Sequence, residues 1–505
     1  MKSDAAGAAV PENRRFLINC VVMLPTVMHS VDITIAAVAL PSMQGALSAT
    51  QDQISWILTS YVLAVAIVTP ATGWLAARLG RRRLFLAAVG GFTLASMLCG
   101  LASGLGEILM FRFLQGGFGA VLIPLSQAVI LDTYPSREHG RAMAIWGVGV
   151  MAGPIIGPTL GAYLTEFHGW RWVFFINLPI GVLALAGIAG FVPESDRGGR
   201  RAFDIFGFLA LAGALTCLQL VMDRGERRDW FADSAIVVGV SAALVGFYLY
   251  VAHSLTTERP FLDRTLFRDR NFIVGLMLGF SVHLSLYATV ALIPPLLQNV
   301  LHYPVLTSGV LFIPRAIGTL IGMFAVSRIP RYVDPRGVIA MGLLIASYGL
   351  WEMTQFTLDV GESDIVWSGL CLGLGLGLVF VPVSTLTFST LPRALRTEGT
   401  GLYAVVRSLG ASLGISVFVT FLVRDIQAAR ATLAESVSPY NSFLRSPHLP
   451  NLGDGQILLK LGSVIEREAE MVAYVNDFWA LMFATLAVLP LVLLIKPPVG
   501  DTEAR

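Results

Sequence analysis

Apolar runs of about twenty residues alternate with short polar segments along almost the whole chain. An α-helix needs about twenty apolar residues to cross the hydrocarbon core of a lipid bilayer. The pattern therefore predicts an all-α membrane protein with fourteen transmembrane helices. The predicted spans are residues 16–40, 54–77, 84–103, 108–131, 142–165, 172–193, 204–222, 234–252, 272–297, 306–327, 338–357, 365–389, 399–423 and 478–496.

Two arginines, Arg14 and Arg15, precede the first apolar run, which contains Asp32. This run is longer than the apolar core of a signal peptide and indicates an uncleaved first span. Most lysines and arginines lie at the N-terminus and in every second loop after it. Cytoplasmic loops are enriched in these residues, so both termini are predicted to be cytoplasmic. Outside the long 424–476 loop, the other side holds only Arg171 and the cluster of Arg224, Arg227 and Arg228, and this cluster is the exception to the pattern.

Composition agrees with a membrane protein, because 55% of the residues are hydrophobic and only 13% are charged. Soluble domains have about 25% charged residues. The net charge of +2 gives no indication of nucleic-acid binding. The cysteines lie singly in apolar runs, so neither a disulfide nor a metal site is predicted. They are Cys20, Cys99, Cys217 and Cys371.

Enzymatic chemistry is not indicated by any motif. None of the lysines (Lys2, Lys460, Lys496) follows a glycine, which excludes the GxxxxGK[ST] loop that binds ATP phosphates. No catalytic triad or catalytic carboxylate pair stands out, so no catalytic residue is assigned. The chain is therefore predicted to be no enzyme and to need no cofactor, with an ion gradient instead of ATP as its energy source.

The spans are grouped into two halves by polar segments near residues 194–201 and 259–271. The predicted organisation is a cytoplasmic N-terminus (1–15), an N-terminal six-helix bundle (16–193), a central hairpin of spans 7 and 8 with its loops (194–271), a C-terminal six-helix bundle (272–496) and a cytoplasmic tail (497–505). Segments 141–157 and 398–414 align weakly, with Gly153 over Gly410 and Gly157 over Gly414. Internal repeats of this kind are typical of transporters whose site lies between two bundles.

A long outer loop is predicted at 424–476 within the C-terminal bundle. Its amphipathic part, 457–475, is interpreted either as a helix on the surface of the protein or bilayer, or as a helix that docks a partner.

Charged residues within apolar runs are the main candidates for function, since burying a charge in a membrane is costly. Asp32 is a candidate for proton or cation binding, with a static polar cap as the alternative. Arg112 must face a cavity or an acceptor because its charge cannot be neutralised; a purely structural arginine is the alternative. Arg315 and Arg407, in spans 10 and 13, either face a cavity or bridge helices.

Two segments are rich in glycine. In span 5 the glycines recur every fourth residue, which makes a smooth face for close helix packing, and two prolines lock local bends. These residues are Gly149, Gly153, Pro154, Gly157, Pro158 and Gly161. Between spans 2 and 3, Gly73 permits close helix approach and Gly80 makes a tight turn. Arg78, Arg81 and Arg82 are available there for helix ends or acidic partners.

The chain resembles the major facilitator superfamily on these segments. The loop between spans 2 and 3 is similar to its motif G-x-L-a-D-r-x-G-r-k, although Ala77 replaces the aspartate. The end of span 1, DITIAAVALP (32–41), resembles the D-x-T-x-x-x-V-A-L-P signature of the fourteen-span drug:proton antiporter branch, the EmrB/QacA type. Arg112 and Gln115 match an R-x-x-q-G motif linked to proton relay. Span 5 resembles the antiporter motif g-x-x-x-G-P-x-x-G of exporters.

The resemblance implies two six-helix bundles with a central hairpin in a bacterial inner membrane. It also implies proton-driven efflux of hydrophobic or amphipathic toxic compounds, including antibiotics. The EmrB-type permeases, which the C-terminal region resembles most, act with an EmrA-like periplasmic adaptor and an outer-membrane channel. Two alternatives remain open: transport of one metabolite or siderophore in either direction, and a membrane receptor or scaffold that transports nothing.

Overall fold

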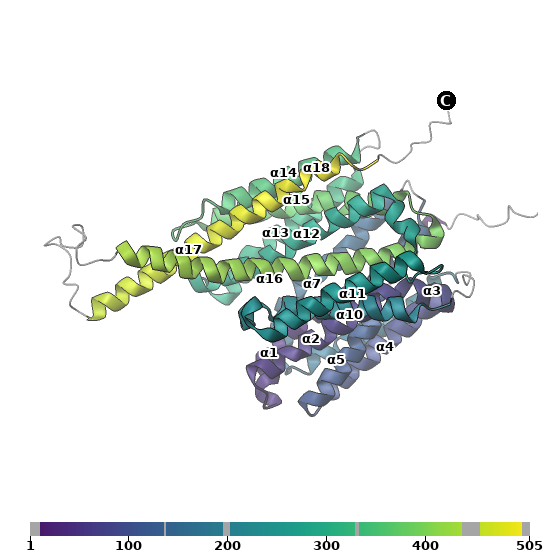
Figure 1. Ribbon diagram of the computed structural model, residues 1–505, viewed down its shortest axis with the longest axis horizontal. Coiled ribbons are helices and arrows are strands. Elements are labelled where there is room, and N and C mark those ends of the chain that lie inside the picture. The colour runs from purple at the N-terminus through teal and green to yellow at the C-terminus, as the bar shows by residue number, and fades with distance from the viewer. Residues whose placement is uncertain (1–10, 136–137, 195–201, 329–332, 437–454, 497–505) are drawn as a thin grey trace, which may run out of the picture.

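The computed structural model describes residues 11–135, 138–194, 202–328, 333–436 and 455–496, and within these ranges the regular elements are helices. The N-terminal half lies on one side of the molecule and most of the C-terminal half on the other (Figure 1). The hairpin of α10 (Ile205–Arg224) and α11 (Ser234–Thr256) lies along the N-terminal half, and α10 contacts both α2 (Gln51–Val68) and α16 (Arg396–Ser436).

The N-terminal half contains six predicted spans, several of which are interrupted helices. Its elements are α1 (Glu12–Ala46), α2 (Gln51–Val68), η1 (Thr69–Ala71), α3 (Thr72–Leu79), α4 (Arg81–Leu101), α5 (Leu105–Gly119), α6 (Leu122–Thr133), α7 (His139–Phe167), α8 (Trp172–Phe175) and α9 (Asn177–Phe191). Gly80 separates α3 from α4 with a φ of 83°, a backbone conformation that glycine adopts without strain.

The hairpin and the C-terminal half follow. The hairpin is α10 (Ile205–Arg224), η3 (Glu226–Arg228), η4 (Trp230–Ala232) and α11 (Ser234–Thr256); η5 (Arg264–Arg268) leads out of it. The C-terminal half is α12 (Arg270–Pro295), η6 (Leu296–Val300), α13 (Val305–Arg328), α14 (Pro335–Met353), α15 (Glu362–Ser389), η7 (Arg393–Leu395), α16 (Arg396–Ser436), α17 (Gly455–Ala487) and α18 (Leu489–Val492). Aspartate side chains cap the N-termini of α10, α12 and α14, where unpaired backbone N–H groups need acceptors.

The predicted all-α membrane fold is confirmed, but the number of spans differs by one. Thirteen helices in the described part of the chain are long and apolar enough to cross a bilayer. The predicted span not among them, 338–357, corresponds to α14, which is a regular helix of 19 residues. Arg336 and Glu352 lie near its two ends and lower its mean hydropathy.

The predicted outer loop 424–476 is for the most part helical. α16 continues to Ser436 and α17 begins at Gly455, so only residues 437–454 lie outside the described part of the chain. The two helices project together beyond the rest of the bundle (Figure 1). Residues 457–475 therefore do not form a separate surface helix. They are the first turns of the helix that becomes the last span, and α16 packs beside it.

The two halves repeat one packing arrangement. A Cβ added to Gly153 on α7 would overlap the backbone carbonyl of Ser30 on α1, and one at Gly410 on α16 would overlap the carbonyl of Phe280 on α12. Only glycine permits such close approach of two backbones. The weak alignment of 141–157 with 398–414 therefore corresponds to equivalent helix pairs, α1 with α7 and α12 with α16.

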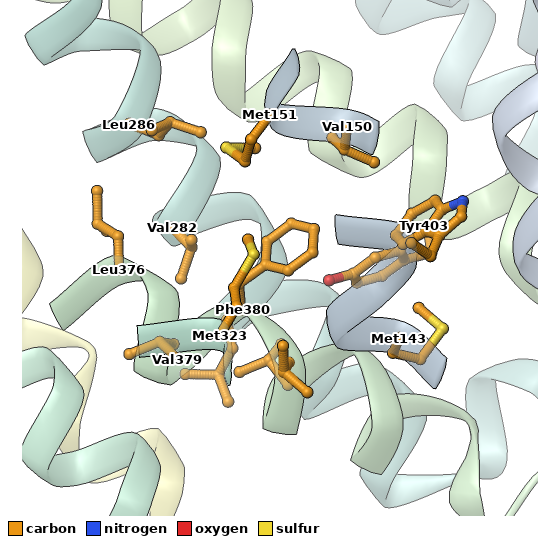
Figure 2. Close-up of a cluster of buried hydrophobic side chains, with 14 of the residues drawn as sticks. Met143, Val150, Met151, Val282, Leu286, Met323, Leu376, Val379, Phe380 and Tyr403 are labelled. Atoms are coloured by element: carbon orange, nitrogen blue, oxygen red, sulfur yellow. The ribbon is translucent and has the colours of Figure 1, made fainter. Parts of the chain in front are cut away.

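The halves meet in an apolar cluster around α7. Its residues Met143, Val150 and Met151 point toward side chains of the C-terminal half (Figure 2). Those side chains are Val282, Leu286, Met323, Leu376, Val379, Phe380 and Tyr403. Trp146 of α7 stacks near Phe380 of α15, with ring centroids 6.3 Å apart.

Candidate functional site

Asp32 and Arg112 form an ion pair in the interior of the N-terminal half. Arg112 Nη1 on α5 lies 2.6 Å from Asp32 Oδ2 on α1, and both side chains are fully buried. On α1, the aspartate lies two residues before Thr34, which makes a close contact with α7. Burying either charge alone would be very costly, so each stabilises the other.

Neutral amides satisfy the second carboxylate oxygen. Gln115 Nε2 donates to Asp32 Oδ1 at 2.8 Å, and Asn177 Nδ2 donates to the same oxygen at 2.9 Å. Arg112 also donates to Gln115 Oε1 and to the Ile57 carbonyl, while its Nη2 has no partner. The carboxylate therefore accepts three hydrogen bonds in a buried site, an arrangement that satisfies its charge.

Aromatic side chains connect this pair to a cavity between the halves. The Arg112 guanidinium lies 4.3 Å from the centre of the Tyr61 ring. The Tyr61 hydroxyl is 2.7 Å from His29 Nδ1, and both of these residues line the cavity. Asp32 and Arg112 do not line it, so they lie behind a layer made by Tyr61 and His29.

The cavity has a volume of about 230 Å³ and is lined by all three parts of the chain. The N-terminal half contributes His29, Tyr61 and Val150 among others, and the C-terminal half contributes His283 and Arg407. The central hairpin closes one side through Gln219 of α10, which exchanges hydrogen bonds with Ser412 of α16 at 2.9 and 3.1 Å.

The C-terminal end of α10 contacts α2 of the N-terminal half. Asp223 accepts a hydrogen bond from Thr59 of α2 at 2.5 Å, and the Arg224 guanidinium lies 4.0 Å from the centre of the Trp56 ring. Arg224 was an exception to the charge pattern of the loops, and this contact with Trp56 accounts for its position. Arg228 pairs with Asp233 at 3.1 Å within the same turn.

The two arginines singled out in the C-terminal half lie in different surroundings. Arg407 lines the central cavity, whereas Arg315 lies in a much smaller pocket with Phe312 and Ser368. Arg315 donates to the Leu286 carbonyl at 2.9 Å and to Thr289 Oγ1 at 2.6 Å, so it joins α13 to α12.

The glycine-rich face of span 5 packs against α1. Gly153, Gly157 and Gly161 approach Ser30, Thr34 and Ile35 so closely that an added Cβ would overlap or crowd them, and Gly149 approaches the side chain of Met23. Pro158 is exposed, whereas the side chain of Pro154 lies outside the described part of the structure. This face therefore fixes the position of α1, which carries Asp32.

The arginine-rich loop meets the C-terminal half at one end of the bundle. Arg81 forms an ion pair with Asp132 at the end of α6 and donates to Thr397 Oγ1 at 2.9 Å. Arg396, at the start of α16, lies 3.1 Å from the other oxygen of Asp132. Asp132 thus holds arginines from both halves, although Ala77 occupies the acidic position of the loop motif.

Other residues of the loop motif have separate contacts. Gly73 lies so close to Glu398 that an added Cβ would be 2.8 Å from its Cα. Arg78 lies over the ring of Trp74 at 5.2 Å, and Arg82 donates to the Ala189 carbonyl.

Several polar residues that join helices or lie buried were not found from the sequence. Asn177, Gln219 and Asp132 are single polar residues within or beside apolar runs, and nothing in their spacing connects them with their partners. Asp477 of α17 is 1% exposed and its Oδ2 has no hydrogen-bond partner. It stands between the predicted loop 424–476 and the predicted span 478–496, so neither prediction included it.

Comparison with known proteins identifies the family. A family model described as Major Facilitator Superfamily matches residues 22–415. The chain is 32% identical over 485 residues to the multidrug export protein EmrB of Escherichia coli strain K12, with 94% of each chain covered. It is also 32% identical over 483 residues to the fatty acid resistance protein FarB of Neisseria gonorrhoeae, covering 94% of this chain and 95% of the relative.

Solved structures agree on the fold. A double-tryptophan mutant of XylE matches with a TM-score of 0.64 at 14% identity, covering 97% of this chain and 98% of that structure. The chain therefore belongs to the Major Facilitator Superfamily and is a multi-pass membrane transporter rather than an enzyme.

Proposed function

We propose that this transporter exports hydrophobic or amphipathic toxic compounds, including antibiotics, across the inner membrane of a bacterium in exchange for protons. The names of its relatives, multidrug export protein and fatty acid resistance protein, support export. The observation that carries the proposal is the buried Asp32–Arg112 pair, placed directly behind the wall of a cavity between the halves. Energy comes from the proton gradient, without a cofactor.

Proton binding at Asp32 would change what its surroundings must stabilise. The ionised carboxylate pairs with Arg112 and accepts from Gln115 and Asn177. The protonated carboxyl is neutral and releases Arg112 from its counter-ion. Tyr61 and His29 connect the pair to the cavity, so proton binding at Asp32 can change the contacts of a substrate in the cavity. Exchange follows when the proton and the substrate favour opposite access states.

Alternating access requires contacts between the halves that can open. Asp132, held by Arg81 and Arg396, closes the end of the bundle that carries the arginine-rich loop. Rocking of the halves would break these solvent-accessible ion pairs at small cost. The glycine contacts inside each half would stay intact, so each half moves as a unit.

The proposed orientation places both termini and the Arg81 loop in the cytoplasm, with the projecting ends of α16 and α17 outside. Cysteine labelling can test this in a variant without native cysteines. Ala431 and Ala394 are both exposed and lie on α16 and in the loop before it. We expect an impermeant reagent to label Ala431→Cys, but not Ala394→Cys, in intact cells. The opposite pattern would reverse the orientation.

The projecting helices are also the proposed attachment point for an EmrA-like periplasmic adaptor, which would connect the transporter to an outer-membrane channel. The amphipathic turns 457–475 at the start of α17 support this placement. Removing an outer turn of both helices should weaken co-purification with such an adaptor while leaving proton-driven transport in vesicles unchanged.

The exchange mechanism is tested in liposomes containing the purified protein. Asp32→Asn keeps the shape of the protonated side chain but cannot release a proton. We expect substrate-induced proton release to disappear in Asp32→Asn and to persist in Asp359→Asn, which changes an exposed carboxylate between α14 and α15. Undiminished coupling in Asp32→Asn would remove Asp32 from the mechanism. Energised inverted vesicles test direction, because an exporter loads them.

A further inference from the structure

Arg407 is a buried cation of the central cavity without a counter-charge. Its side chain projects from α16 into the cavity wall and is only 8% exposed. No hydrogen bond or ion pair to Arg407 occurs in the described part of the chain, and its Nη1 is buried without a partner. The nearest aromatic contact is the Tyr403 ring, whose centre lies 6.0 Å from the guanidinium carbon.

The other polar groups of the cavity wall are largely satisfied by the protein. The hydroxyls of Ser30 and Thr34 each donate to a backbone carbonyl of α7 at 2.9 Å. His29 is hydrogen-bonded to the Tyr61 hydroxyl, and His283 to the Gly279 carbonyl. Gln219 is hydrogen-bonded to Ser412. Among the lining residues of the described structure, Arg407 alone has a buried side-chain nitrogen or oxygen without a partner.

The charge of the cavity wall has one sign. Its lining contains no aspartate or glutamate within the described residues, since Asp32 lies behind Tyr61 and is already neutralised by Arg112. A guanidinium remains charged in proteins, and a buried charge needs a partner. In this cavity an anionic group of a ligand would supply that partner.

The remaining walls define what is attached to the anionic group. Ile33, Val62, Val65, Ile123 and Leu215 give the cavity an apolar surface. An alkyl or aromatic body would bury its apolar area against them. The volume of about 230 Å³ is below the usual range for drug-sized ligands, roughly 300–1,000 Å³, which favours small amphiphiles.

We propose that Arg407 binds the anionic head group of an amphipathic organic acid, whose apolar body occupies the cavity between α2, α6 and α10. This inference rests on the proposed export function and names its substrate class. A carboxylate suits the site best, because a guanidinium can donate two parallel hydrogen bonds to it. The substrate site and the proton site are then separate, with the cation for the substrate in one half and the carboxylate for the proton in the other.

Three ligands with one carbon skeleton test this inference. They are 4-phenylbutyrate, 4-phenylbutan-1-ol and 4-phenylbutylammonium, which carry a negative, a neutral and a positive head group. Binding is measured by calorimetry with the full-length protein in lipid nanodiscs. We expect the wild type to bind the carboxylate at least about tenfold more tightly than the ammonium compound, as charge-assisted hydrogen bonds imply.

Variants assign the preference to Arg407. Arg407→Gln should abolish it, and Arg407→Lys should keep part of it because lysine retains the charge without the planar fork. Arg315→Gln is the matched control, since it also removes a buried arginine of the C-terminal half but outside this cavity. Unchanged preference in Arg407→Gln, or a wild type that binds the alcohol as well as the carboxylate, would overturn the inference. If Arg407→Gln does not purify as a single species, the wild-type preference and Arg407→Lys decide.

Transport in energised inverted vesicles separates this inference from the proposed function. Uptake of neutral or cationic compounds, without binding or uptake of 4-phenylbutyrate, would contradict this inference but agree with the proposed export function. Carboxylate binding that depends on Arg407, with no proton-driven uptake of any compound, would support the anion site and contradict the export mechanism.

Discussion

The two halves share their packing but differ in their buried charges. On α1, Ser30 and Thr34 face the glycines of α7; on α12, Phe280 and Leu284 face the glycines of α16. Asp32 lies midway between the first two residues, and the residue midway between the second two is Val282. A repeated scaffold therefore carries a carboxylate in one half and a buried valine in the other.

The two halves also differ in whether their buried charged side chains have counter-ions. In the N-terminal half, Asp32 and Arg112 satisfy each other, with help from neutral amides. In the C-terminal half, Arg315, Arg407 and Asp477 are buried, and none of them makes an ion pair within the described residues. The close helix contacts therefore occur in both copies of the repeated scaffold, whereas the buried ion pair occurs in only one of them, within the described residues.

The largest expected effect concerns the shared packing. Gly153→Leu and Gly410→Leu should each abolish transport, because the new side chain would overlap a backbone carbonyl of the neighbouring helix. Overpacking of a core usually costs about 1–3 kcal/mol, and the cost here is larger because the overlapping atoms belong to the backbone. Efflux and membrane insertion are measured together, with Gly190→Leu as control because an added Cβ there meets nothing within 4 Å. Normal efflux in only one of the two variants would break the equivalence of the halves.

The next effect compares two buried arginines. Arg112→Ala leaves Asp32 buried without its counter-ion, and we expect a loss of about 3–5 kcal/mol in the free energy of unfolding. Arg315→Ala leaves no acid behind and should cost less, about 1–3 kcal/mol from lost hydrogen bonds. Denaturant unfolding of both variants in the same detergent measures the difference. Equal losses would mean that the ion pair adds nothing beyond hydrogen bonding.

A smaller effect is expected where the halves meet. Asp132→Asn should loosen both Arg81 and Arg396, at a cost of about 1 kcal/mol for such partly exposed pairs. The cavity should then open more often toward the arginine-rich end. In a variant lacking native cysteines, Ala404→Cys in the cavity wall reports this as faster labelling by an impermeant reagent in inverted vesicles. An unchanged rate would show that Asp132 does not hold the halves together.

The smallest effect serves as the baseline. Arg83 pairs with Glu194 at 3.1 Å, but both side chains are more than half exposed. Arg83→Ala should change stability by less than about 1 kcal/mol and leave transport unaffected. A transport defect comparable to that of Arg81→Ala would indicate a role for Arg83 outside its ion pair.

Hydrophobic pattern was sufficient to predict the membrane fold and nearly all of its helices, because bilayer thickness imposes the length of each apolar run. Asp32 and Arg112 could be singled out for the same reason, since a charge in such a run is costly. Their contact could not be predicted, because it depends on how α1, α2 and α5 are arranged in space and on the reach of the Arg112 side chain. Arg315 and Arg407 have the same local signal, and the sequence does not tell which of them faces the central cavity.

An amphipathic helix at 457–475 was predicted, but its continuation into the last span and the extension of α16 to Ser436 were not. Residues 424–436 and 455–476 are polar enough to resemble a loop, yet the two helices stabilise each other outside the apolar region. Helix length there is determined by packing between neighbours, which hydropathy does not record.

The position of Asp32 outside the cavity wall affects how much net charge crosses the membrane in each transport cycle. When the proton and the substrate do not share one carboxylate, the charge moved in each cycle depends on the substrate. For one proton entering, a departing monovalent cation leaves no net charge transfer, a neutral compound leaves one, and a monovalent anion leaves two. Each charge contributes about 2.3 kcal/mol per 100 mV of membrane potential. An organic acid held by Arg407 would thus be the cargo that the membrane voltage expels with the greatest force.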